Sequence, residues 1–321
     1  MFLFDQHSLL TEIAAYLSQE LSFIERDELL MHTEIAGEGN MNVVLRLQTQ
    51  KRSFILKQSR PYVQKYPDLP APLERIAVEE QFYAQMQNHP FFPKVLRYVQ
   101  KDHLMLLEDL GQCEDLTSLY SQGSVSEALL NDLVAALAQI HQRPVPGDYP
   151  QNKSLRKLNH QHIFVFPYAL ENGFSLDSIQ KGLEELALPF KKDEQLKKKI
   201  ECLGERYLQE GNTLLHGDYY PGSWMRSNKK LYIIDPEFSF IGFKEFDLGV
   251  MAAHLILATT NPDYLNRICD LYPTSLNQDY VRQLCGAEIL RRLIGLAQLP
   301  LQRSLKEKQQ LLSLAKDFIA S

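Results

Sequence analysis

The sequence of 321 residues is poor in cysteine and tryptophan and has no long hydrophobic run. Its four cysteines, Cys113, Cys202, Cys269 and Cys285, form no C-x-x-C pair, which excludes a zinc knuckle or a dithiol redox motif. The longest uncharged apolar stretch, residues 248–260, is too short to span a bilayer, and the first residues lack the pattern of a signal peptide. Because free thiols are typical of a reducing compartment, we expect a cytoplasmic protein without a membrane partner.

The charge balance gives no sign of a polyanionic partner. Lysine and arginine number 34 and aspartate and glutamate 40, so the formal net charge is −6. A mildly acidic chain argues against nucleic acid as the main partner. Apolar residues make up 45% and charged residues 23%, which excludes disordered, collagen-like and coiled-coil proteins. The length corresponds to about two domains.

The first third of the chain has the alternation typical of β-strands. Four runs are expected to form two hairpins: residues 43–47 with 53–57, and residues 95–100 with 103–107. Helices are expected over residues 5–20 and 73–87, with a proline-rich loop over residues 61–72. This part is therefore predicted to be mostly antiparallel sheet.

The remainder is predicted to be helical apart from two short strands. The expected elements are helices over 128–141, 180–209 (interrupted by Pro189) and 248 to the end, and strands over 213–215 and 230–234. We therefore predict an α+β protein with an antiparallel-sheet N-terminal lobe, residues 1–111, and a larger helical C-terminal lobe, residues 112–321. A hinge at residues 108–111 favours a ligand cleft, since ligand sites prefer domain interfaces.

Two short apolar strands each end in carboxylates, which is the strongest chemical signal. His216-Gly217-Asp218 follows the first strand and Asp235-Pro236-Glu237 the second. If the strands are neighbours, Asp218, Asp235 and Glu237 meet at one edge. Phosphoryl transfer needs one carboxylate to orient and deprotonate the attacking hydroxyl, and others as hard ligands for magnesium. A single acid of this kind would only cap a turn, but the two motifs together favour catalysis.

Two weaker signals lie in the first third. Gly37 and Gly39, just before the first strand, suit a loop whose backbone amides cover phosphates, although such turns are common. Lys57 ends an apolar strand, where an unpaired ammonium would be costly, so it requires an anionic partner. Glu79 on the following helix is the natural partner, and a solvated strand end is the alternative.

The order of these motifs resembles the aminoglycoside phosphotransferase and choline kinase superfamily, and within it most closely the 5-methylthioribose kinases. The matching segments are Gly37-Glu38-Gly39-Asn40-Met41-Asn42, Lys57-Gln58 with Pro61-Tyr62-Val63, His216-Gly217-Asp218 with Gly222-Ser223, Asp235-Pro236-Glu237-Phe238 through Phe246-Asp247-Leu248-Gly249, and Arg291-Arg292-Leu293-Ile294-Gly295-Leu296-Ala297. The resemblance runs from Glu34 to Gln298 and implies a protein-kinase-like bilobal fold.

The resemblance also implies an ATP- and Mg2+-dependent kinase of a sugar-like small molecule, and a role for each matching residue. The catalytic residues would be Asp218 as base, with Arg291 and Arg292 toward the acceptor or the transferring phosphate. The nucleotide would be held by Gly37, Gly39, Asn40, Lys57, Glu79, Glu108 and Leu110, and the metal by Asp235 and Glu237. The sequence leaves a homodimer open.

Some residues depart from the family pattern, and they lie on the acceptor side. Ser223 stands where most of the superfamily has a metal-binding Asn, and Tyr220 and Pro221 replace a His and a Thr. Phosphorylation by ATP is therefore better supported than methylthioribose as the acceptor. The alternatives are an aminoglycoside-type phosphotransferase, which needs acids around a cationic acceptor, and a non-catalytic nucleotide-binding regulatory protein.

Overall fold

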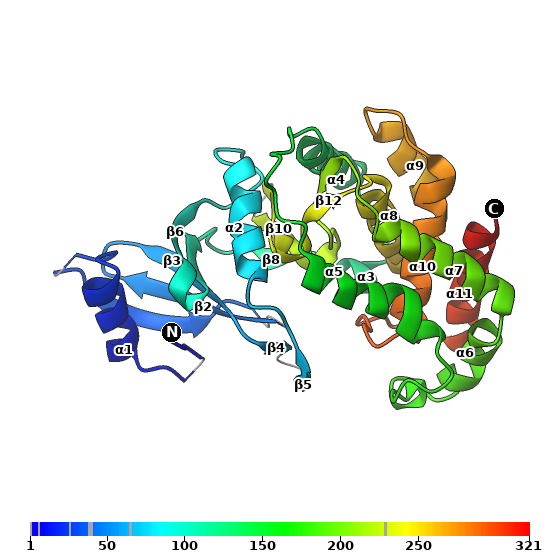
Figure 1. Ribbon diagram of the computed structural model, residues 1–321, viewed down its shortest axis with the longest axis horizontal. Coiled ribbons are helices and arrows are strands. Elements are labelled where there is room, and N and C mark those ends of the chain that lie inside the picture. The colour runs from blue at the N-terminus through cyan, green and yellow to red at the C-terminus, as the bar shows by residue number, and fades with distance from the viewer. Residues whose placement is uncertain (1, 6, 26, 38–40, 64–65, 228–229) are drawn as a thin grey trace. The chain divides into compact units, whose positions relative to one another are not determined.

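The computed structural model describes residues 2–5, 7–25, 27–37, 41–63, 66–227 and 230–321 (Figure 1). The chain divides into two compact units, one up to Cys113 and one from Glu114 onward, and each is described by itself.

The first unit is built on a five-stranded antiparallel sheet. Its strands, in the order β1-β2-β3-β7-β6 across the sheet, are β1 (Leu30–Ile35), β2 (Asn42–Thr49), β3 (Ser53–Ser59), β7 (Leu104–Glu108) and β6 (Val95–Val99). The two hairpins expected from the sequence, β2 with β3 and β6 with β7, are confirmed.

The two faces of this sheet carry different side chains, because successive residues of a strand point to opposite sides. Phe54 and Leu56 of β3 face a buried apolar cluster that includes Ile13 and Leu17 from the N-terminal helix. Lys57 points to the other face, against which helix α2 (Arg75–Gln85) packs. The alternation of β3 thus directs its lysine toward α2.

Two segments of the first unit differ from expectation. The predicted helix over residues 5–20 is shorter: α1 (Leu10–Ala15) continues into a π-helical turn, Tyr16–Glu20. The predicted proline-rich loop contains a small antiparallel pair, β4 (Tyr62–Val63) and β5 (Tyr66–Pro70). Prolines are tolerated in such an isolated pair, since an edge position needs no N–H donor.

The second unit is mostly helical (Figure 1). Its α-helices are α3 (Leu119–Gln122), α4 (Glu127–His141), α5 (Lys153–His160), α6 (Leu183–Lys191), α7 (Glu194–Tyr207), α8 (Glu245–Thr259), α9 (Tyr264–Leu271), α10 (Gln278–Ile294) and α11 (Leu305–Ala320). Helix α8 is buried from Glu245 to Ala258 and packs against α10. A helix that is apolar all round must lie inside the protein, so α8 is the centre of this unit.

The strands of the second unit form two small sheets. One is β11 (Lys230–Ile233), β10 (Trp224–Ser227) and β8 (Glu114–Asp115), and the other is β12 (Phe240–Gly242) with β9 (Thr213–Leu215). The strands before Asp218 and Asp235 do not pair with each other, because β9 pairs with β12 and β11 with β10.

The predicted break at Pro189 is also misplaced. Pro189 lies inside α6, and the chain leaves the helix only after Lys191. The next helix, α7, begins where the Asp193 carboxylate accepts hydrogen bonds from the N–H groups of Gln195 and Leu196, both at 3.0 Å. A capping carboxylate, and not the proline, therefore sets this boundary.

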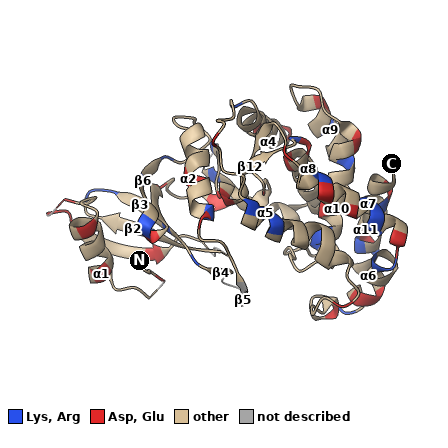
Figure 2. Cartoon of the chain, viewed as in Figure 1, with Lys and Arg blue, Asp and Glu red and all other residues tan. Residues whose placement is uncertain are grey.

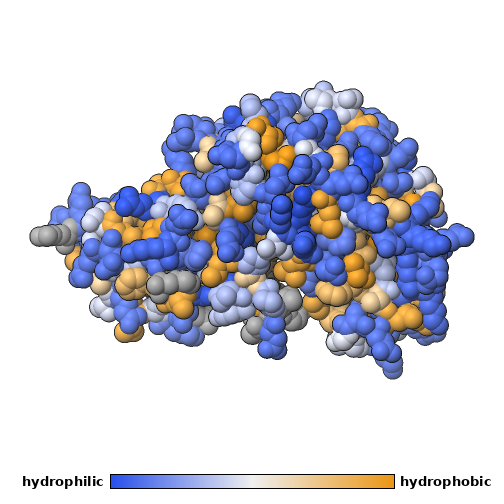
Figure 3. All heavy atoms as spheres, viewed as in Figure 1, coloured by the Kyte–Doolittle hydropathy of each residue, from blue (hydrophilic) through white to orange (hydrophobic). Residues whose placement is uncertain are grey.

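Charged residues of both signs lie on the helices of the second unit, including α7 and α11 (Figure 2). On the face drawn in Figure 3 the surface is mostly hydrophilic, with hydrophobic side chains in small groups. Among the described residues, no helix is long and apolar enough to cross a membrane.

Candidate functional site

The structure brings Lys57 and Glu79 together in the first unit. The Lys57 Nζ atom lies 2.7 Å from Oε1 and 2.6 Å from Oε2 of Glu79, and both side chains are almost wholly buried. A buried ion pair needs close geometry to offset the loss of hydration, and this one has it. The pair fixes the ammonium group on the α2 face of the sheet.

Helix α2 holds a second buried cation one turn before Glu79. The Arg75 guanidinium donates to the carbonyls of Arg60 and Pro72, at 2.8 and 2.7 Å, and to the Asn42 side-chain oxygen at 2.9 Å. It also donates to the carbonyl of Met41. One helix therefore contacts both the lysine strand and the first residues after the glycine segment.

The glycine segment is described only in part. Gly39 and Asn40 lie outside the described residues, whereas Gly37 is described, and a Cβ atom added there would meet no described residue within 4 Å. No described residue therefore fills the space beside Gly37.

Some backbone groups of segment 108–111 form hydrogen bonds within the protein. The N–H of Glu108 donates to the carbonyl of Lys94 at 2.9 Å, and the carbonyl of Leu110 lies 3.3 Å from Cys113 Sγ. Arg46 fixes the same segment, through Asp109 at 3.1 Å and the carbonyl of Gly111 at 2.9 Å.

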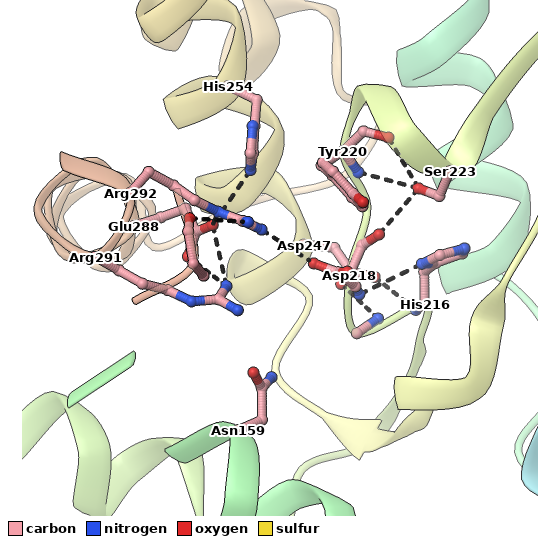
Figure 4. A network of polar contacts seen from close by, with 12 residues as sticks. Asn159, His216, Asp218, Tyr220, Ser223, Asp247, His254, Glu288, Arg291 and Arg292 are labelled. Carbon is pink, nitrogen blue, oxygen red and sulfur yellow. Dashed lines mark hydrogen bonds and ion pairs between the residues drawn. The ribbon is translucent and has the colours of Figure 1, made fainter. Parts of the chain in front are cut away.

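In the second unit, the loop after β9 is clamped by a carboxylate that the sequence did not single out as functional. Asp247, at the start of α8 and fully buried, accepts hydrogen bonds from the N–H of His216 at 2.7 Å and of Gly217 at 3.0 Å. It also lies 3.1 Å from His141 Nε2. These contacts hold the backbone that presents Asp218 (Figure 4).

Gly217 is required by the geometry of this loop. Its φ of +85° lies in the left-handed region, and an added Cβ would come within 2.2 Å of the Phe238 carbonyl oxygen. Any side chain here would therefore push the loop away from the Asp235-Pro236-Glu237 segment.

Ser223 closes the same loop. Its hydroxyl accepts from the N–H of Tyr220 at 3.1 Å and lies 2.9 Å from the carbonyl of Asp218, and the residue is buried. The hydroxyl is thus engaged by the backbone that carries Asp218.

The segment with Asp235 and Glu237 follows β11 and is tied to β9. Asp235 has a φ of +60°, a left-handed conformation that non-glycine residues seldom adopt. Strained backbone conformations of this kind are common at functional sites. Glu237 is buried, and its carbonyl accepts from Asn152 Nδ2 at 2.8 Å. Ser239 donates to the carbonyl of Leu215 at 2.6 Å, which joins this segment to the strand before Asp218.

These two carboxylates are a donor set that fits magnesium. Mg2+ in phosphate-binding sites is held by one or two carboxylates, with phosphate oxygens and water completing the shell. Within the described ranges, no three His, Cys, Asp or Glu side chains form a ready-made metal centre.

Arg291 and Arg292 are buried instead of lying on the helix surface, and Arg292 is next to Asp218. Both are buried in α10, and Arg292 Nη2 lies 3.5 Å from Asp218 Oδ1. Between them lies Glu288, a buried carboxylate absent from the sequence-based site. The arginines at i+3 and i+4 after a helical glutamate were the signal that could have indicated it.

Burial raises the pKa of the Asp218 carboxyl to about 6. The charges of Arg292 and Arg291 act in the opposite direction, while those of Glu288 and Glu237 add to the rise. Asp218 is therefore a carboxylate at neutral pH with a higher proton affinity than an exposed aspartate. Such a group can accept a proton from a bound hydroxyl, and the neighbouring guanidiniums can stabilise negative charge.

Comparison with known proteins agrees with this chemistry. A methylthioribose kinase from Exiguobacterium sibiricum is 28% identical over 246 residues, 72% of this chain and 62% of that protein. One from Geobacillus sp. is 24% identical over 327 residues, 85% of this chain and 80% of that protein. The chain thus spans less than two thirds of the first relative and four fifths of the second. The predicted resemblance is confirmed.

Solved structures confirm the predicted fold. Choline kinase LicA from Streptococcus pneumoniae has a TM-score of 0.54 at 15% identity, covering 98% of this chain and 99% of that one. Spectinomycin phosphotransferase APH(9)-Ia has a TM-score of 0.53 at 14% identity, covering 97% of each chain. The model of the phosphotransferase enzyme family matches residues 32–293, which include all the site residues described above, so the chain belongs to this family.

Proposed function

We propose that this protein is an ATP-dependent small-molecule kinase that transfers the γ-phosphate to a hydroxyl of a sugar-like metabolite, as methylthioribose kinases do. The observation that carries this proposal is Asp218, held on a clamped loop beside two buried arginines, with Glu237 near enough to raise its pKa. This reaction needs one carboxylate for the hydroxyl, other carboxylates for the metal, and guanidiniums for the phosphoryl group.

Asp218 is assigned the role of base. It orients the acceptor hydroxyl and takes its proton as the oxygen attacks the γ-phosphorus. A pKa of about 6 leaves it ionised at neutral pH and still basic enough to hold the proton. Catalysis otherwise rests on positioning and on neutralising charge, since phosphoryl transfer requires little covalent chemistry from the protein.

Asp235 and Glu237 are assigned to magnesium, which would neutralise charge on the nucleotide phosphates. Ser223 is not assigned to the metal, because its hydroxyl is bonded within the catalytic loop. The two carboxylates therefore carry the protein's share of metal binding.

The first unit is assigned to the nucleotide. Lys57, held by Glu79, would contact the α- and β-phosphates, and the segment of Gly37, Gly39 and Asn40 would cover them. The backbone between Glu108 and Leu110 would receive the adenine. Residues 1–111 are thus proposed as the nucleotide lobe and residues 112–321 as the catalytic and acceptor lobe, in a protein of the reducing cytoplasm.

The charges near Asp218 favour an uncharged or anionic acceptor. Arg292 lies 3.5 Å from Asp218, the charge of Arg291 acts on the same carboxyl, and the buried Glu288 is already bonded to both arginines. A polycationic acceptor would meet these guanidiniums, which opposes the aminoglycoside-type alternative. The retained Lys57, Asp218, Asp235 and Glu237 oppose the non-catalytic alternative.

The test is an ADP-release screen with Mg-ATP and a panel of methylthioribose, other sugars, amino alcohols and aminoglycosides. We expect turnover with a sugar and none with aminoglycosides. Turnover confined to aminoglycosides would favour the second alternative, and nucleotide binding without transfer to any acceptor would favour the third. The product hydroxyl is then mapped by phosphorus NMR.

The matched variant is Asp218→Asn, which should bind nucleotide and lose turnover. It should also remain folded and be more stable at pH 7. Because burial raises the folded-state pKa of Asp218 above its unfolded value of about 4, stability falls as the pH rises from about 4 to about 6, and the full cost of ionising the buried carboxyl is present at pH 7. The amide removes this cost, which is on the order of 3 kcal/mol. Near-normal turnover in this variant would overturn the role of Asp218.

A further inference from the structure

Glu288 in α10 is a buried carboxylate with three cationic or donor side chains around it (Figure 4). Arg291 Nη1 lies 3.1 and 3.0 Å from its two oxygens, Arg292 Nε lies 2.6 Å from Oε1, and His254 Nε2 lies 3.2 Å from Oε1. The mechanism above gives this residue no role.

The Arg292 guanidinium is shared between two carboxylates. Its Nε atom is bonded to Glu288 at 2.6 Å, while its Nη2 atom lies 3.5 Å from Asp218 Oδ1. Charge-assisted N–H···O bonds are about 2.7–2.9 Å long, so the contact with Asp218 is loose. With its Nε donor used by Glu288, Arg292 cannot offer its Nε–Nη2 edge to Asp218 as a bidentate pair.

His254 and Tyr120 fix Glu288 from the other side. Burial lowers the pKa of His254 to about 4, so the ring is neutral at pH 7. An ionised carboxylate only accepts hydrogen bonds, so Nε2–H of His254 donates to Glu288. Its Nδ1 then accepts from the Tyr120 hydroxyl at 2.6 Å, and this chain of contacts links α3, α8 and α10.

We propose that Glu288 is a positioning residue, which restrains Arg292 so that Asp218 keeps a free oxygen for the acceptor hydroxyl. If the charge of Glu288 is removed, the nearest anion for Arg292 is Asp218. A bidentate pair would then occupy the oxygens of Asp218 that the hydroxyl needs. The expected effect on turnover rests on the proposed kinase function. The restraint of Arg292 by Glu288 does not depend on it.

The test compares Glu288→Gln, which keeps the shape and loses the charge, with Glu288→Asp, which keeps the charge at a shorter reach. We expect Glu288→Gln to lower kcat on the order of 100-fold, with the KM for ATP little changed, because misplacing a group at the reacting centre by about 1 Å costs this much. Glu288→Asp should retain most of the activity. A role in packing alone would reverse this order, and that result overturns the proposal.

The matched control is Glu201→Gln, which removes the same charge from an exposed position of α7 and should leave kcat unchanged. A parallel loss in the control would overturn the proposal. If Glu288→Gln does not fold, Tyr120→Phe replaces it as the decisive variant. It should lower kcat without changing the KM for ATP, and an unchanged kcat would contradict the inference.

A crystal structure of Glu288→Gln gives a readout that needs no acceptor. The separation of Arg292 Nη2 from Asp218 should fall from 3.5 Å to about 2.8 Å. An unchanged separation overturns the positioning role even if the wild-type protein is an active kinase. A closed pair in a protein that transfers phosphate to no acceptor would support the positioning role and overturn the proposed function.

Discussion

The backbone around Asp218 is held by hydrogen bonds, and its carboxylate lies near both arginines and other carboxylates. Asp247 holds the two preceding N–H groups, and Gly217 supplies the left-handed turn that no other residue fits. Its side chain is 24% exposed, so it is reachable by a small acceptor although the surroundings are mostly desolvated. Rigidity and desolvation together are the conditions for a base whose pKa is raised toward neutrality.

Activity should therefore fall in mild acid. Because the pKa of Asp218 is raised to about 6, the carboxylate is protonated below that pH and can no longer accept the hydroxyl proton. We expect kcat/KM to decrease about tenfold per pH unit below pH 6, as for one required deprotonated group. The measurement is a pH profile from 4.5 to 8.

A thermal-unfolding series in the same buffers serves as the control for this profile, since loss of the fold would also lower activity. An acid limb centred near 4, as for an exposed aspartate, would contradict the raised pKa. A profile that follows the unfolding temperature would indicate acid denaturation instead of titration of the base.

At the residue level, the sequence motifs indicated Asp218, Asp235 and Glu237. They did not indicate Glu288 or Asp247, whose roles depend on tertiary contacts. Asp218 lies three residues after the end of β9 and Asp235 two residues after the end of β11, where a carboxylate is conspicuous. Glu288 is marked in the sequence only by the arginines three and four positions after it, and its role depends on His254, 34 positions earlier in the chain. Such a contact exists only once α8 and α10 have packed.

Among the elements, α2 combines two functions. Glu79 binds the strand lysine, and Arg75, one turn earlier on the same helix, binds the backbone that follows the glycine segment. A displacement of α2 would therefore disturb both contacts together. The helix serves as a common support for the groups proposed to hold the phosphates.

The stability and the function of the Lys57–Glu79 pair should be separable. Lys57→Met or Glu79→Leu breaks this buried ion pair from one side and should destabilise the protein by about 3–5 kcal/mol. The double variant Lys57→Met/Glu79→Leu removes both charges and should recover most of this stability, while nucleotide affinity stays low. Urea unfolding and calorimetric titration with ADP measure the two properties.

A double variant no more stable than either single variant would contradict this account of the pair. Nucleotide affinity near that of the wild-type protein in the double variant would remove Lys57 from the proposed site.

Local pattern predicted the hairpins β2–β3 and β6–β7, because alternation and a short polar turn are encoded within about 15 residues. It did not predict that β9 pairs with β12 and β11 with β10. Strands of three or four residues carry too little pattern to choose a partner, and the choice depends on the fold around them. Pro189 did not mark the end of α6 either. The boundary between α6 and α7 is set by the Asp193 carboxylate, which caps α7.

For the molecule as a whole, the cysteines stabilise no part of the fold by cross-linking. None of the four is joined in a disulfide: Cys202 is exposed, Cys113 and Cys269 are partly buried, and Cys285 is buried. Burial raises the pKa of Cys269 to about 11 and raises that of Cys285 as well. The thiolate forms of Cys269 and Cys285 are therefore scarce at neutral pH.

The native protein should react with a thiol reagent in distinct phases. Since the thiolate is the nucleophile, exposed Cys202 should react first, Cys113 and Cys269 more slowly, and Cys285 only after denaturation. The measurement is the time course of thiol release with a chromogenic disulfide at pH 8. In Cys202→Ser the first phase should vanish, and its persistence would contradict the assignment.

The links between the two catalytic segments have a consequence for chain length. The carbonyl of Ile234 lies 2.9 Å from His216 Nε2, its N–H donates to the carbonyl of Ser223, and Ser239 donates to that of Leu215. The distance between Asp218 and Asp235 is thus fixed by contacts close to both residues, while most of the chain between them forms the β10–β11 hairpin to one side. Insertions or deletions in that hairpin can change the number of residues between the two acids without moving either, so their spacing in the sequence is a poor measure of relatedness.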